Sequence, residues 1–186
     1  MPRQILFIQG AGKAVHDDWD SKLVDSLRER LGDDFIVTYP RMPAEADPHF
    51  APWKAALMAE FDRLDDGAVL IGHSVGGTVL LHTLADSLPH FRPGAIILIA
   101  PPFIGEGGWP SDDIRPRDRF ELPEGTPVRL YHGQADDTVP AAHAALYANA
   151  IPKLQVIALP GRDHQLGNDL SEVARYIQAL PVEQPA

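Results

Sequence analysis

The sequence of 186 residues has no cysteine, few basic side chains and no long apolar run, and each absence narrows what the protein can do. Without cysteine there is no disulfide, no thiolate metal site and no cysteine nucleophile. The chain has 16 basic and 26 acidic side chains and a formal net charge of -10. Because such a surface repels phosphate backbones and anionic lipid headgroups, nucleic acid and membranes are poor partner candidates. A small molecule is the expected partner.

The first apolar run, residues 5–8, is too short for a secretory signal or a membrane span. We therefore expect a cytoplasmic protein. Hydrophobic residues make up 45% of the chain, which is close to the average for folded globular domains. The length and composition predict one domain over residues 1–186.

Six short runs rich in aliphatic residues predict strands over residues 5–8, 35–39, 68–71, 95–100, 128–131 and 154–159. Three of these runs, residues 5–8, 68–71 and 95–100, are continuously apolar, which is typical of a parallel sheet covered on both faces. The stretches between them have helical spacing, for example Trp19, Leu23, Leu27 and Leu31. This α/β alternation predicts a doubly wound, mainly parallel six-stranded sheet with helices on both faces, whose ligands bind beyond the carboxyl ends of the strands.

A Gly-x-Ser-x-Gly motif, Gly72 to Gly76, lies between the third predicted strand in this chain and an apolar helical pattern. Glycines there permit a tight strand-to-helix turn that presents the Ser74 hydroxyl. We interpret Ser74 as a nucleophile, and the Val75 N–H at the helix N-terminus as a donor to a developing oxyanion. The alternative is a small residue in a tight turn.

Candidate partners for this serine follow the last two predicted strands. Asp136 lies in the loop after residues 128–131, and His164 lies in the loop after residues 154–159. In the order serine, acid, histidine, each loop brings one polar group to the carboxyl edge of the sheet. His164 is the expected base and Asp136 the carboxylate that orients it, with Asp137 as a competing choice for the acid.

The turn after the first strand, Gln9-Gly10-Ala11-Gly12, is expected to supply the second oxyanion donor through the Ala11 N–H. His16 either contacts substrate above Gly10 or is simply exposed. The acidic cluster around it has the residue types of a hard-metal site, but acidic residues before an apolar helix are ordinary capping groups; the cluster is His16, Asp17, Asp18 and Asp20. We expect no metal and no cofactor.

Three motifs together resemble the α/β-hydrolase superfamily over nearly the whole chain: the serine motif, Gly133-x-x-Asp136 with Val139-Pro140, and Gly161-x-x-His164. The small size, with Gly10-Ala11-Gly12 followed by His16 and Trp19, is similar to the compact capless branch of retinoblastoma-binding-protein-type serine hydrolases. This resemblance implies an α/β-hydrolase fold with no cap domain. One departure is Gln9-Gly10, where the family usually has His-Gly.

The irregular stretch over residues 101–126 takes the place of the cap that larger family members insert. We expect it to line a shallow acyl pocket with Phe103 and Trp109. The resulting hypothesis is a carboxylesterase that cleaves small or short-chain esters through an acyl-enzyme on Ser74. A thioesterase, amidase or peptidase with the same residues is an alternative, and so is a non-catalytic binding protein on a hydrolase fold.

Overall fold

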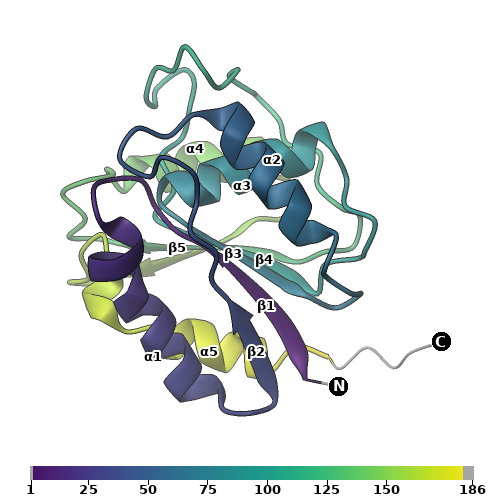
Figure 1. Cartoon of the computed structure of the whole chain (residues 1–186). Coiled ribbons are helices and arrows are strands. Elements are labelled where there is room, and N and C mark those ends of the chain that lie inside the picture. Colours follow the sequence, from purple (N-terminus) through teal and green to yellow (C-terminus); the bar gives the residue numbers. More distant parts are fainter. Residues whose placement is uncertain (1, 182–186) are drawn as a thin grey trace.

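The computed structural model describes residues 2–181 and shows one twisted sheet between two layers of helices (Figure 1). The strands are β1 (Arg3–Ile8), β2 (Phe35–Thr38), β3 (Val69–His73), β4 (Ala95–Ile99), β5 (Val128–Gly133) and β6 (Gln155–Leu159). The sheet order is β2-β1-β3-β4-β5-β6, and all five neighbouring pairs are parallel. The predicted fold class is confirmed, and each predicted strand ends within two residues of its expected bounds.

Helices cover both faces of this sheet (Figure 1). On one face lie α1 (Ser21–Leu31) and α5 (Ser171–Gln178), and on the other lie α2 (Phe50–Phe61), α3 (Val75–Asp86) and α4 (Ala142–Ala150). Each layer closes its own hydrophobic cluster against the sheet. The central strands β3 and β4 are buried at every position, which explains why their sequences are continuously apolar rather than alternating.

The α1 region departs from the helical spacing of the sequence at Trp19. That spacing predicts Trp19 on the apolar face with Leu23 and Leu27, but the Trp19 side chain is 53% exposed while both leucines are fully buried. The cause is a π-helical turn, Val15–Asp20, that precedes α1. Its wider turn changes the phase of the side chains, so that Trp19 points outward and Asp20 is buried instead.

The strand order places a topological switch point between β1 and β3. From β1 the chain crosses to β2 on one side, and from β3 it crosses to β4 on the other. Ligand sites of open α/β sheets form at the carboxyl ends of strands at such a point. The turn after β1 and the turn after β3 are the two segments that meet there.

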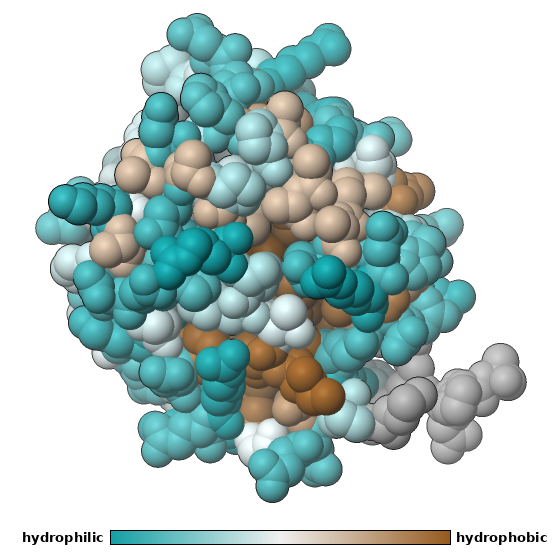
Figure 2. All heavy atoms as spheres, in the orientation of Figure 1, coloured by the Kyte–Doolittle hydropathy of each residue, from teal (hydrophilic) through white to brown (hydrophobic). Residues whose placement is uncertain are grey.

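Residues 100–127 connect β4 to β5 without a helix or strand, apart from an isolated bridge between Ile104 and Trp109. The face shown in Figure 2 is mostly hydrophilic, with an apolar area over the β2 edge of the sheet, where Ile36 is half-exposed. Within residues 2–181, no helix combines the length and the apolar character that crossing a bilayer requires.

Candidate active site

Ser74 occupies the turn between β3 and α3 in a strained backbone conformation. Its φ is 51° and its ψ is -129°, a combination that side-chain-bearing residues rarely adopt and that persists where the surroundings enforce it. The Ser74 N–H donates to the Ile99 carbonyl at 2.8 Å, and the Gly77 N–H donates to the Ser74 carbonyl at 2.9 Å. These bonds on both sides of the turn hold the serine at the carboxyl end of β3.

The glycines of the motif are required by close backbone contacts. A Cβ at Gly72 would lie 2.5 Å from the Gly77 Cα, and a Cβ at Gly76 would lie 2.1 Å from the Gln9 carbonyl oxygen. The first contact lets α3 begin directly beside β3. The second packs the N-terminus of α3 against the turn after β1, so the expected oxyanion turn and the serine motif are in direct contact. A Cβ at Gly10 would lie 3.1 Å from the Ser74 Cβ.

The structure pairs His164 with Asp136. The His164 Nδ1 lies 2.8 Å from the Asp136 Oδ2, and the other Asp136 oxygen accepts the N–H groups of Thr138 at 2.9 Å and Val139 at 2.8 Å. The Asp136 side chain is inaccessible to solvent. The competing Asp137 is exposed and bonds the Thr138 hydroxyl at 3.4 Å.

The surroundings keep Asp136 ionised. Burial opposes ionisation, but hydrogen bonds from His132, His164 and the Val139 N–H outweigh it and hold the pKa of the Asp136 carboxyl well below its usual range. The His132 Nε2 lies 3.3 Å from the Asp136 Oδ2. A carboxylate at Nδ1 fixes the proton of the His164 ring on that nitrogen and leaves Nε2 to act as a base.

Ser74 and His164 lie at the same edge of the sheet and share His73 as a neighbour. The His73 ring centroid is 4.9 Å from that of His164, and the His73 Nε2 is 3.1 Å from the His164 carbonyl oxygen. Within residues 2–181, no hydrogen bond joins the Ser74 hydroxyl to the His164 ring. Catalytic hydrogen bonds are often long before substrate binds and tighten in the reacting complex.

Both expected oxyanion donors are available. Neither the Val75 N–H nor the Ala11 N–H donates to another group in the described part of the chain. Their neighbours are occupied, because the Gly10 N–H donates to the Asp20 Oδ2 at 2.7 Å and the Gly12 N–H donates to the Glu45 carbonyl at 2.6 Å. The turn is thus fixed on both sides of Ala11 while the Ala11 N–H stays open.

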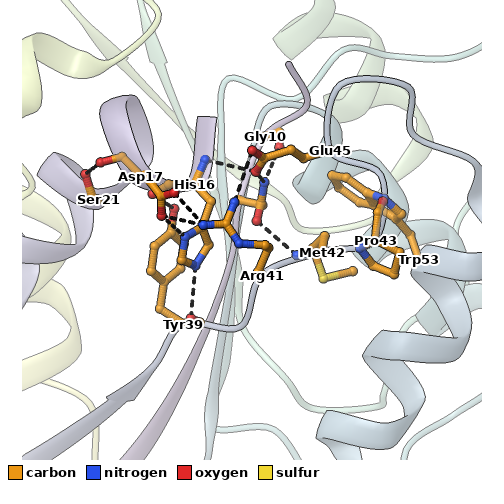
Figure 3. A network of polar contacts seen from close by, with 11 residues as sticks. Gly10, His16, Asp17, Ser21, Tyr39, Arg41, Met42, Pro43, Glu45 and Trp53 are labelled. Atoms are coloured by element: carbon orange, nitrogen blue, oxygen red, sulfur yellow. Dashed lines mark hydrogen bonds and ion pairs between the residues drawn. The ribbon is translucent and has the colours of Figure 1, made fainter. Parts of the chain in front are cut away.

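Gln9, which stands where the family usually has histidine, is fully buried and supports this turn. Its Nε2 donates to the Glu45 Oε2 at 2.8 Å, and its Oε1 accepts the Met42 N–H at 3.0 Å. Glu45 also accepts from the Arg41 guanidinium at 3.2 Å (Figure 3). The segment after β2 therefore holds the turn after β1 in place. Nothing in the sequence near Glu45 signals this role.

His16 is partly buried and does not line the pocket described next. Its ring stacks on Tyr39 with centroids 4.2 Å apart, and its Nδ1 lies 2.8 Å from the Asp17 Oδ1 (Figure 3). Asp17 also pairs with Arg41. Asp20 is turned inward, and within residues 2–181 these acidic side chains and His16 do not gather into a group that could hold a metal ion.

A pocket with a volume of about 170 Å³ lies beside the serine motif. Val75, Thr78, Val79 and Trp109 are among the residues that line it. Phe103 is instead buried in the core, with its ring 5.0 Å from that of Tyr147. Residues 48–50, at the start of α2, also line the pocket. No sequence motif lies near them to mark this role.

Comparison with known proteins supports this architecture. A family model described as the alpha/beta hydrolase family matches residues 5–176. Comparison with curated proteins finds no significant match. Among solved structures, the ydeN gene product from B. subtilis is 17% identical with a TM-score of 0.70, covering 95% of this chain and 97% of that one.

Two further structures are similar to this chain. XC6422 from Xanthomonas campestris, described as an a/b serine hydrolase without lid, is 18% identical with a TM-score of 0.66 and covers 98% of this chain and 84% of its own. Est1E from Butyrivibrio proteoclasticus is 16% identical with a TM-score of 0.65, over 95% and 85% of the two chains. At these identities the likeness shows the lidless fold. With the family match over residues 5–176, the chain belongs to the alpha/beta hydrolase family.

Proposed function

We propose that this hydrolase is a serine esterase that cleaves small esters through an acyl-enzyme on Ser74. The observation that carries the proposal is the 2.8 Å contact between the His164 Nδ1 and the Asp136 Oδ2 at the sheet edge where Ser74 occupies its strained turn. A base oriented by a buried carboxylate, next to a hydroxyl on a nucleophile elbow, is the arrangement that acyl transfer requires.

The reaction follows from the roles of these groups. The His164 Nε2 takes the Ser74 proton as the hydroxyl attacks the ester carbonyl, and Asp136 stabilises the imidazolium that forms. The N–H groups of Val75 and Ala11 bind the oxyanion of the tetrahedral intermediate. Collapse of that intermediate expels the alcohol, which takes the proton back from His164. Water activated by the same ring then releases the acid and frees Ser74. No metal or cofactor enters any step.

The pocket beside Val75 supports a small acyl group as the substrate. Its wall is mainly apolar, with Val79, Ile104 and Trp109 among the lining residues, and its volume of about 170 Å³ is below the range of about 300–1,000 Å³ for drug-sized ligands. Solved structures of similar fold include an esterase domain from Rhodothermus marinus and Est1E with ferulic acid bound. Thioesters and amides remain the alternative substrates for the same machinery.

Hydrolysis of 4-nitrophenyl esters tests this proposal. Wild-type protein is assayed with acetate, butyrate and octanoate esters, beside Ser74→Ala and His164→Ala. Matched controls are Ser87→Ala at the far end of α3 and the exposed His90→Ala. We expect the first two variants to lose at least about 10³-fold in kcat and both controls to keep wild-type rates. Turnover that survives in Ser74→Ala, or a preference for octanoate, would contradict the proposal.

A further inference from the structure

A second carboxylate–imidazole pair lies behind the candidate site and takes no part in the reaction proposed above. Asp20 is fully buried and His73 is 1% exposed, and the Asp20 Oδ2 lies 2.9 Å from the His73 Nδ1. We propose that this pair positions the oxyanion turn and the histidine loop relative to Ser74. Asp20 and His73 are thus positioning residues, and the inference rests on the proposed function of the site.

Asp20 connects the turn after β1 directly with the loop after β6. Its Oδ2 accepts the Gly10 N–H at 2.7 Å, which fixes the turn after β1. Its Oδ1 accepts from the Gln165 Nε2 at 3.2 Å, in the loop after β6. Since the Gly10 N–H is occupied by this carboxylate, the peptide is held so that the next N–H, that of Ala11, stays open for an oxyanion. Loss of the carboxylate would free this peptide to rotate.

His73, the last residue of β3 before Ser74, connects the serine turn with Asp20 and with the loop after β6. It must carry two protons to do so. Its Nδ1 faces the Asp20 carboxylate and its Nε2 faces the His164 carbonyl oxygen at 3.1 Å. Both neighbours are acceptors, and a neutral imidazole has one N–H to donate, so the imidazolium alone satisfies both contacts. The ring therefore forms a charged bridge from Asp20 to the backbone of His164.

The electrostatics agree with this geometry. Burial of the His73 ring opposes its charge, but the adjacent Asp20 carboxylate outweighs burial and raises the pKa of His73. Burial likewise opposes ionisation of Asp20. The charge on His73 and the hydrogen bonds to the carboxylate outweigh burial, so the pKa of Asp20 is lowered. Buried ion pairs add little to stability compared with well-packed apolar residues, so a role in positioning explains the presence of the pair better than stability does.

The backbone before α1 directs Asp20 to this place. The π-helical turn Val15–Asp20 ends at Asp20 and turns it into the interior while Trp19 stays exposed. Such turns are rare and occur frequently at functional sites. A regular helix with the spacing of the sequence would bury Trp19 instead, and the turn after β1 would lose its carboxylate.

Three variants test the positioning role. Asp20→Leu removes all hydrogen bonds of the carboxylate. Asp20→Asn keeps an oxygen for the Gly10 N–H, and its amide donates to the Gln165 Oε1 once that side chain turns over; this oxygen is buried without a partner in the described chain. The asparagine removes only the charge that keeps His73 doubly protonated. Leu57→Ala, a fully buried site in α2, is the control for general destabilisation. Kinetic constants are measured with 4-nitrophenyl acetate and expressed per folded molecule.

We expect Asp20→Leu to lower kcat at least about 100-fold, the effect of misplacing reacting groups by roughly 1 Å, with KM changed less than about threefold. Asp20→Asn should stay within about tenfold of wild type, and Leu57→Ala should keep the wild-type kcat. If Asp20→Leu stays within about threefold of wild type, or if Leu57→Ala loses as much as Asp20→Leu, the inference is overturned.

Two further measurements keep the test decisive. If Asp20→Leu does not fold, His73→Asn takes its place: the asparagine amide reaches Asp20 but not the His164 carbonyl, so kcat should fall while the Gly10 amide resonance stays unchanged. If the wild-type protein shows no turnover, the proposed function fails by itself. The positioning role is then decided by nuclear magnetic resonance, because Asp20→Leu should shift the His164 ring resonances further than Asp20→Asn does. Unshifted resonances in Asp20→Leu would overturn it.

Discussion

Gly76→Ala should inactivate the protein by moving the oxyanion turn. The added Cβ would lie 2.1 Å from the Gln9 carbonyl oxygen, whereas ordinary contacts begin near 3.4 Å, so this gap has to open by about 1.3 Å (3.4 − 2.1). A displacement of that size separates the Ala11 N–H from the oxyanion position. Losing one such donor costs about 2.7–4 kcal/mol in the transition state, and we therefore expect kcat/KM to fall about 100- to 1,000-fold.

The assay for this prediction is hydrolysis of 4-nitrophenyl acetate together with urea unfolding. Overpacking should also cost about 1–3 kcal/mol of stability, so Gly125→Ala is the matched control. Gly125 has a φ of 77° and no atom within 4 Å of the added Cβ, which leaves only left-handed backbone strain of about 1–2 kcal/mol. The control should keep wild-type kcat/KM. Activity of Gly76→Ala above about a third of wild type would refute the reasoning.

Three other predictions follow from contacts in the structure. Asp136→Asn should lower kcat by about 10⁴-fold because an amide does not hold the required imidazole tautomer, whereas Asp137→Asn should stay within about threefold; equal losses in ester hydrolysis would contradict the pairing. Gln9→Met removes the bond to Glu45 and leaves the buried Met42 N–H without its acceptor. Urea unfolding should therefore show a loss of about 2–4 kcal/mol in the free energy of unfolding. A loss below about 0.5 kcal/mol would argue that Gln9 does not stabilise the turn after β1. Burial lowers the pKa of His82 from 6.5 to about 4. As the pH drops, this histidine therefore binds a proton in the unfolded chain before it does so in the folded protein. The free energy of unfolding should fall between pH 6.5 and pH 4 by up to about 3 kcal/mol. His82→Leu should flatten that part of a urea-unfolding pH series, and an unchanged slope would show that this histidine is not responsible.

The sequence predicts the sheet well because burial on both faces leaves a local pattern. Strands such as β3 and β4 are continuously apolar and fully buried, and the alternation with helices limits the possible topologies. The loops of the candidate site can be predicted for a similar reason, since Ser74, Asp136 and His164 each follow a recognisable strand. Their motifs are local in sequence even though the side chains meet across the fold.

The residues that the sequence did not reveal act through distant contacts. Gln9 bonds Glu45, 36 residues away, and the π-helical turn before α1 changes which side chain of that segment is buried. In the loop between β4 and β5, Phe103 is buried and Trp109 lines the pocket. No periodicity distinguishes two aromatic residues in an irregular loop, so the sequence alone assigns them the same role.

The most direct test of the central claim is to locate the covalent adduct of a fluorophosphonate by peptide mass spectrometry. The probe modifies an activated serine and stays attached, so the site of attack can be read from the modified peptide. We expect one phosphonate on Ser74 in the wild-type protein, and no labelling in either Ser74→Ala or His164→Ala. An unlabelled wild-type protein, or an adduct on any other serine, would contradict the account.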